Sequence, residues 1–324
     1  MVRIGPDTAE FLVGASVRAP SVYNTQPWRF AHRDDGTIEV WADRCQALPA
    51  ADPAGRELVI SCGAALATLV LGIRWFGHQA VVRRLPDPAQ PNLLAHVAAG
   101  PAYSPGQQEL DMFHAVLDRH THRGRFADIA VAPALLARLT TLARSAGVRA
   151  CLIRDQRKLR RMTRLTTAAQ RIQLRQPPVQ DELTYWLRAA DTPERDGIVS
   201  PEPDPPAGTT PVRFRDTRPD ALPDRRATTI LLASGRDDPM AWLRAGEALQ
   251  RMLLHAARHG VNAAIYTQPL EVPSVRARMA ALTGGGYPQM LFQLGRSRGV
   301  STAARRTPAE VLVPAAPSLL AEHG

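Results

Sequence analysis

A dense polar turn near the N-terminus holds the residues of this sequence that are best equipped for chemistry. Pro20 and Ser21 open it, Asn24 and Gln26 follow, and Trp28 stands at its end. Proline and asparagine favour an irregular turn over a helix. The polar side chains, with the backbone groups that such a turn leaves unpaired, could recognise a flat heterocycle with donors and acceptors on its edge. The alternative is an ordinary capped turn with Trp28 filling the core.

Two groups of arginines elsewhere in the chain could hold a phosphate. The first is Arg119-His120-Thr121-His122-Arg123, which adds a hydroxyl to its cations, and the second is Arg305-Arg306-Thr307-Pro308. A guanidinium binds phosphate through two parallel hydrogen bonds, and a hydroxyl can donate another. Each arginine has a plain alternative as a solvated surface residue, because Lys158 is the single lysine among 40 basic residues.

Together these stretches resemble the nitroreductase family of FMN-dependent proteins. Residues 19–30 are similar to the family's Pro-Ser-x-x-Asn-x-Gln-Pro-Trp signature beside the flavin pyrimidine ring, and residues 119–123 resemble its Arg-Arg-Ser-x-Arg element. Residues 294–308 are similar to its terminal strand, glycine, and basic residue two positions before a proline. The resemblance implies FMN as cofactor, NADPH or NADH as reductant, and hydride transfer through flavin N5 to a nitroaromatic, quinone or similar acceptor, without a catalytic protein side chain.

The same resemblance gives a role to each position that matches a family motif. Arg119 and Arg306 would hold the phosphate with the hydroxyl of Thr121, while Arg123 would sit at the N1/O2 edge and favour the anionic reduced flavin. The other implied cofactor-binding residues line the ring, at its pyrimidine edge and near N5: Pro20, Ser21, Asn24, Gln26, Tyr266, Thr267 and Gln268. No metal is implied.

The order of the motifs departs from an ordinary nitroreductase, where the arginine element precedes the turn and two subunits build two sites. Here the turn at residue 20 precedes the arginines at 119. This order is similar to that of a fused, single-chain subgroup resembling the mycobacterial dormancy-associated Acg proteins. It implies an α+β, nitroreductase-like fold of two pseudo-repeated halves, residues 1–106 and 107–324, that form an intramolecular pseudo-dimer. One FMN per chain and a monomer are expected, with a homodimer left open.

The elements that must position these residues follow from apolar periodicity and from glycine and proline punctuation. Helix and strand alternate in two successive passes, an α+β pattern and not a regular βαβ alternation. Helices are expected at 7–18, 56–77, 107–119, 133–145, 156–175, 242–259 and 275–282, and strands at 29–32, 38–41, 79–85, 93–99, 148–153, 228–233, 262–266 and 289–294.

A proline-rich segment interrupts the second pass. Residues 176–226 contain ten prolines, so little regular structure is expected there apart from a short helix at 181–190. Such a long segment inside a compact domain is usually a lid, a binding loop or disordered. In the subgroup that the chain resembles, a lid of this kind covers the flavin. The segment therefore supports a second function, a flavin-sequestering or storage protein with little turnover.

Composition argues against several other classes of protein. The net charge is +10, yet the arginines are scattered along the chain, so no nucleic-acid partner is expected. No apolar stretch reaches the roughly 20 residues of a membrane helix. The three cysteines lack metal-ligand spacing, and His255 and His259 lack the glutamate of a zinc-protease motif. The N-terminus carries no apolar signal core, so a cytoplasmic location is expected.

Overall fold

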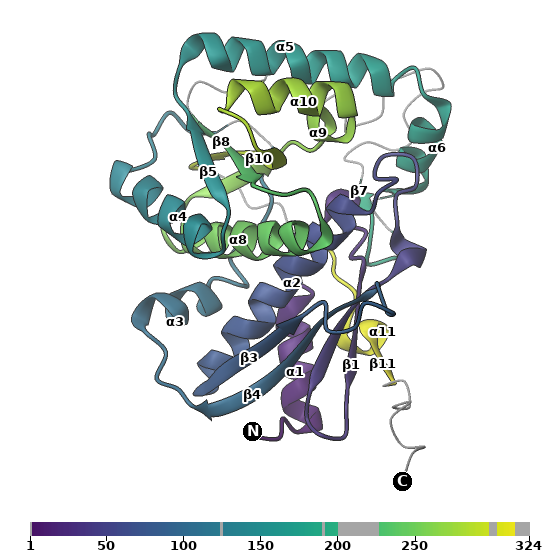
Figure 1. Cartoon of the computed structure of the whole chain (residues 1–324), viewed down its shortest axis with the longest axis vertical. Coiled ribbons are helices and arrows are strands. Elements are labelled where there is room, and N and C mark those ends of the chain that lie inside the picture. The colour runs from purple at the N-terminus through teal and green to yellow at the C-terminus, as the bar shows by residue number, and fades with distance from the viewer. Residues whose placement is uncertain (1, 124–125, 190–191, 200–226, 298–302, 315–324) are drawn as a thin grey trace.

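Two sheets with the same strand order form the frame of the molecule (Figure 1). The computed structural model describes residues 2–123, 126–189, 192–199, 227–297 and 303–314. The first sheet contains the order β1-β2-β4-β3 and the second the order β5-β8-β10-β9, with antiparallel pairing throughout both runs. The bounds are β1 Trp28–His32, β2 Ile38–Ala42, β3 His78–Arg84, β4 Leu93–Ala102, β5 Arg149–Ile153, β8 Thr228–Ser234, β9 Asn262–Ile265 and β10 Tyr287–Gly295.

The helices repeat together with the strands. α1 (Pro6–Ser16) precedes β1 as α4 (Pro133–Ser145) precedes β5. Likewise α2 (Arg56–Trp75) links β2 to β3, and α8 (Pro239–Arg258) links β8 to β9. The repeat matches the expected α+β fold of two similar halves on one chain. The boundary at residues 106 and 107 stays a prediction.

α2 and α8 cross at the centre of the molecule, and a glycine on each helix lets the backbones approach closely. A Cβ on Gly63 would strike the carbonyl oxygen of Leu243, and a Cβ on Gly246 would strike that of Ile60. Glycine is required at both positions because neither has room for a side chain. The contact is reciprocal, since Ile60 belongs to the apolar core of the second half and Leu243 to that of the first.

α2 is apolar nearly all round, and its surroundings explain why. Among the described residues it is the helix long and apolar enough to cross a membrane, but 83% of its apolar window is buried inside the protein. A helix of this composition suits a protein core as well as a bilayer. Here it packs against α1, α8 and the first sheet, as the expected buried helix.

The proline-rich insert holds more regular structure than the sequence indicates. The helix expected at 181–190 is wrong in its bounds, because Pro177 and Pro178 occupy the first helical turn, where a missing N–H breaks no hydrogen bond. Two short strands follow it and pair in parallel. The bounds are α5 Gln156–Gln173, α6 Pro177–Tyr185, β6 Leu187–Arg188 and β7 Ile198–Val199. Residues 200–226 of the expected lid lie outside the described residues.

The chain returns to the first sheet after β10. α11 (Pro308–Val311) is followed by β11 (Leu312–Pro314), which pairs in parallel with β1 so that Leu312 lies opposite Phe30. The sequence predicts no helix or strand after residue 294, because two short elements leave no periodic pattern to read. The return brings Arg305 and Arg306 to the N-terminal half.

Other elements also differ from expectation. α3 (Gln107–His114) ends before Arg119, because the backbone continues in tight turns after residue 114. β4 runs through Pro101. Proline, which has no N–H to donate, is tolerated there because β2 pairs with β4 only as far as Val97. A short helix, α9 (Gln268–Glu271), precedes α10 (Pro273–Leu282).

Candidate functional site

The turn after α1 has an unusual backbone. Tyr23, Asn24 and Gln26 have φ angles of 51°, 56° and 52°, in the left-handed region that residues with a Cβ disfavour. Such conformations persist where surrounding contacts impose them, and they concentrate at functional sites. Ser21 supplies one such contact, because its Oγ accepts the backbone N–H of Gln26 at 3.0 Å. Pro20 and Trp28, which flank the turn, are both buried, and the Trp28 side chain fills the core as the plain alternative expected.

Two segments distant in sequence clamp this turn. From the C-terminal side, the Arg306 N–H donates to the side-chain carbonyl of Gln26 at 2.9 Å, and the Asn24 amide donates to the Ala304 carbonyl at 3.1 Å. From the insert, Arg195 accepts the Gln26 amide N–H at 2.7 Å, and the Gly197 N–H donates to the Asn24 carbonyl at 3.2 Å. The amide of Gln26 is therefore engaged within the protein, whereas the buried Oδ1 of Asn24 has no described hydrogen-bond donor.

The insert docks on the same region through an apolar cluster and a carboxylate. Trp186 and Ile198 are buried together with Tyr23. The Glu182 carboxylate accepts the backbone N–H groups of Ala50 at 2.9 Å and Ala51 at 3.0 Å. The described part of the insert is thus held to the first half beside the turn.

Arg119 belongs to a group of cations that we call the basic cluster: Arg18, Arg119, Arg123 and Arg305. Its side chain is buried, and one Nη donates to the Arg18 carbonyl at 3.0 Å. Its Nε and other Nη have no hydrogen-bond partner among the described residues. Burial, together with the positive charges of Arg305 and Arg18, lowers the pKa of Arg119 to about 9. A buried cation without a counter-charge is costly, so this cluster is suited to bind an anion.

Arg305 completes the basic cluster. Its guanidinium donates to the carbonyls of Ala303 at 3.1 Å and Ala304 at 3.0 Å, while its buried Nε has no described partner. Burial lowers its pKa to about 10, together with the charges of Arg18 and Arg123. The sequence motif pointed to the next residue, and Arg18 carried no signal beyond its place directly before the turn. Arg18 was missed, and Arg305 was named only as part of its motif, because the fold alone brings both beside Arg119.

Arg306 has a different environment from the basic cluster. Its guanidinium donates to the backbone carbonyl of Gln26. Burial lowers its pKa, but Asp43 and Asp196 act in the opposite direction. With acidic groups nearby and the turn as its partner, Arg306 fits a phosphate-binding role less well than Arg305 does.

β9 lies between two groups of predicted site residues, the arginine segment 119–123 and residues 266–268. Thr121 forms a parallel bridge with Ala263, and the His122 N–H donates to the Ala263 carbonyl at 2.7 Å. The strand ends directly before Tyr266, whose hydroxyl lies 3.3 Å from Oε1 of Gln293. Thr267 and Gln268 follow and are buried. One short strand therefore links Thr121 with residues 266–268, while Arg123 is exposed at the end of the arginine segment.

A buried acidic group lies where the first half meets α9. Arg56 pairs with Glu57 at 2.5 Å and donates to the Gln289 carbonyl at 2.6 Å. Burial, together with the charge of Glu271, raises the pKa of Asp52 to about 6 and that of Glu57 well above its usual range. Sequence reasoning missed this group because Glu271 and Gln289 are far in the chain from Asp52, Arg56 and Glu57. The described residues contain no group of three or more side chains suited to hold a metal ion.

Comparison with known proteins finds relatives named as nitroreductases. No protein-family model matches the chain. The Mycobacterium tuberculosis protein named "Putative NAD(P)H nitroreductase Rv3131" is 33% identical over 300 residues, covering 89% of this chain and 85% of the relative. A second protein of that organism, "Putative NAD(P)H nitroreductase acg", is 29% identical over 314 residues, covering 93% of each.

Among solved structures, a nitroreductase with bound FMN from Desulfitobacterium hafniense has a TM-score of 0.44 and 11% identity, covering 63% of this chain and 97% of that one. The FMN and NADPH-dependent nitroreductase NfnB of a Sphingopyxis strain has a TM-score of 0.43 and 17% identity, covering 63% and 99%.

Proposed function

Because this chain belongs to the NAD(P)H nitroreductase family, we propose that it binds FMN and uses NADPH or NADH to reduce a small organic acceptor, such as a nitroaromatic or a quinone. The observation that carries the proposal is Arg119, a buried guanidinium that has two unpartnered nitrogen donors among the described residues and the positive charges of Arg305 and Arg18 beside it. FMN carries a phosphate dianion, whose negative charge and acceptor oxygens suit the unpartnered donors of Arg119 and Arg305.

The residues present fit the cofactor at both of its ends. Arg119 and Arg305 would bind the phosphate, with the hydroxyl of Thr121 as a further donor. At the other end the buried Oδ1 of Asn24 offers an acceptor to a ring N–H, and Pro20 and Ser21 shape the turn beside it. Arg123 would face the N1/O2 edge, and residues 266–268 would line the ring.

When bound, FMN supplies the hydride chemistry, and the protein supplies position and charge. The turn presents its polar groups in a fixed conformation, because the clamps on Gln26 and Asn24 hold the three left-handed residues in place. Arg123 would stabilise negative charge on the ring edge. Tyr266 is oriented by its backbone hydrogen bond to Leu291 at 2.8 Å. Since the chain contributes both the turn and the basic cluster, we expect one FMN per chain.

One observation favours a second candidate function, a flavin-sequestering protein. The insert contacts the turn itself, through Arg195 on Gln26 and Gly197 on Asn24. An insert that remained closed over the flavin would keep nicotinamide and acceptor away from it.

Anaerobic mixing separates the two functions. The FMN-loaded protein is mixed with NADPH and, separately, with NADH, and the flavin absorbance is followed by stopped flow. If the protein is a reductase, the flavin absorbance should bleach within seconds with at least one nucleotide. The absorbance should recover when a quinone is added. A flavin that stays oxidised with both nucleotides but is reduced by light would support sequestration and contradict the reductase. A protein that takes up no FMN would contradict both.

A further inference from the structure

A groove between α5 and α10 lies apart from the proposed flavin site. It encloses about 400 Å³, a volume within the range of small-molecule pockets. Both helices line it, with Leu165 and Leu282 contributing apolar surface from the core of the second half. The full lining is Arg161, Arg164, Leu165, Ala168, Arg278, Ala281 and Leu282. None of these residues belongs to the turn, the basic cluster or residues 266–268.

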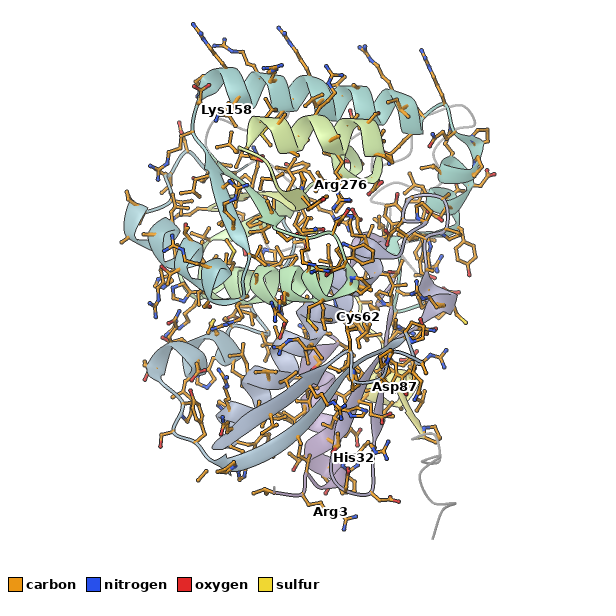
Figure 2. The ribbon with its side chains drawn as sticks, in the orientation of Figure 1. Arg3, His32, Cys62, Asp87, Lys158 and Arg276 are labelled. Atoms are coloured by element: carbon orange, nitrogen blue, oxygen red, sulfur yellow. The ribbon has the colours of Figure 1, made fainter. Side chains whose placement is uncertain are left out.

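Three arginines stand around this groove, and all are exposed. Arg161, Arg164 and Arg278 take part in none of the ion pairs between described residues. Arg276, on the same helix as Arg278, shows the contrast, because both of its Nη atoms bond to the Asp237 carboxylate at 2.7 Å. Figure 2 labels Arg276 on the side of α10 that faces the sheet. The groove therefore gathers like charges that have no described counter-charge.

α5 itself strengthens the positive potential of the groove. The helix contains no acidic residue, and the Asp155 carboxylate before it is engaged by the backbone N–H groups of Arg157 and Lys158. Figure 2 shows nitrogen-tipped side chains extending from the outer side of this helix. Its six basic side chains are Arg157, Lys158, Arg160, Arg161, Arg164 and Arg171.

We propose that the groove between α5 and α10 binds a small organic phosphate with an aromatic or aliphatic body. The phosphate would lie between the guanidiniums of Arg161, Arg164 and Arg278, which favour planar, bidentate hydrogen bonds to such a group. The body would lie over Ala168 and Ala281, with the edges of the buried Leu165 and Leu282 beneath it, and remove this apolar surface from water. A long polyanion needs the charge but not the hollow or the apolar lining. A small ligand uses all three features.

The test uses the full chain loaded with one equivalent of FMN and freed of excess FMN, so that the flavin site is filled and the groove is not, with 1-naphthyl phosphate as a fluorescent probe. Inorganic phosphate and 1-naphthol serve as comparison ligands, because the first has only the phosphate of the probe and the second only its ring. Because charge and apolar contact act together, we expect the probe to bind at least about tenfold more tightly than either half. Absence of probe binding up to millimolar concentration, or equal affinity for the probe and 1-naphthol, would overturn the proposal.

Four variants locate the binding. Arg164→Gln and Arg278→Gln should each weaken probe binding by about tenfold, the size of one lost charged hydrogen bond. Ala281→Phe should fill the groove and abolish binding without a change in charge, since Ala281 is exposed. Arg157→Gln, on the same helix outside the groove, should change affinity less than about twofold at physiological salt.

Two further outcomes would also refute a groove site. Probe binding that survives Ala281→Phe and perturbs the flavin spectrum would place the probe at the flavin. Duplex DNA that binds more tightly than the probe, with equal losses in Arg157→Gln and Arg164→Gln, would make α5 a surface for polyanions.

Discussion

The backbone N–H of Arg306 donates to the side-chain carbonyl of Gln26 at 2.9 Å, across 280 residues of sequence. Through this bond the end of the chain fixes the turn near its beginning, and Arg305 is placed in the basic cluster as a result. The same glutamine donates to the insert at Arg195. Gln26 therefore joins the turn, the returning chain and the insert, and the proposed flavin site depends on all three.

The two adjacent arginines near the C-terminus should have separable effects. Arg305→Gln should weaken binding of FMN by about tenfold or more and leave riboflavin, which has no phosphate, almost unchanged. Arg306→Gln should instead weaken both flavins alike, because it removes a contact that holds the turn. Flavin fluorescence titration with both ligands measures this. Equal loss of FMN selectivity in both variants would show that Arg306 also binds the phosphate.

Docking of the insert should depend on Glu182. In Glu182→Gln the amide can accept only one of the two N–H groups of Ala50 and Ala51, and its NH2 meets the other as a second donor. We expect faster proteolysis of the insert and faster flavin reduction by NADPH. Glu194→Gln is the control, since Glu194 is an exposed carboxylate of the same insert. Unchanged proteolysis in Glu182→Gln would mean that the carboxylate does not secure the insert.

The crossing of α2 and α8 should tolerate no side chain. Gly246→Ala places a methyl group against the backbone of Ile60 and should lower the free energy of unfolding by about 1 to 3 kcal/mol or more. Gly235→Ala, where no atom lies within 4 Å of the added carbon, should have little effect. Urea unfolding compares the two variants. A Gly246→Ala protein as stable as the Gly235→Ala control would contradict the close crossing.

Stability should fall as pH rises through the range in which Asp52 titrates. Burial raises the pKa of Asp52 to about 6, so the folded protein holds this proton more tightly than the unfolded chain does. The resulting loss of stability begins near the unfolded pKa of about 4, is complete above about pH 6, and is on the order of 2 to 3 kcal/mol.

Asp52→Asn isolates this effect, because its amide oxygen can still accept the Leu58 N–H while it carries no titrating proton. Between pH 4 and pH 7 the free energy of unfolding of the natural protein should therefore decline relative to that of Asp52→Asn. Asp87→Asn is the opposite control, because hydrogen bonds from Gln90 and Ala89 lower the pKa of that carboxyl. Parallel pH profiles for the natural protein and Asp52→Asn would exclude Asp52 as the source.

Helices and strands with a local sequence pattern were predicted correctly, whereas elements that form only when distant segments meet were not. The helix at 133–145 and the strand pair around residues 29–41 follow from periodicity and turn residues, which act within a few positions. β11 could not be foreseen, because a strand of three residues acquires its partner only when the chain folds back onto β1.

The site shows the same division. The polar turn is a local motif and was found, but the left-handed backbone of Tyr23, Asn24 and Gln26 depends on clamps from the insert and the C-terminal segment. Arg18 and Arg305 meet Arg119 only in three dimensions, and in an arginine-rich chain nothing in their own neighbourhood distinguishes them.

The proposed flavin site depends above all on the buried guanidinium of Arg119 binding the phosphate of FMN. The most direct measurement compares FMN and riboflavin affinities of the natural protein and Arg119→Met, with the stability of both apoproteins. We predict a loss of FMN affinity of about tenfold to more than a hundredfold, with riboflavin affinity nearly unchanged. The apoprotein should be equally or more stable, because a buried uncompensated charge is removed. FMN affinity that is unchanged in Arg119→Met, or a natural protein that binds riboflavin as tightly as FMN, would contradict the account.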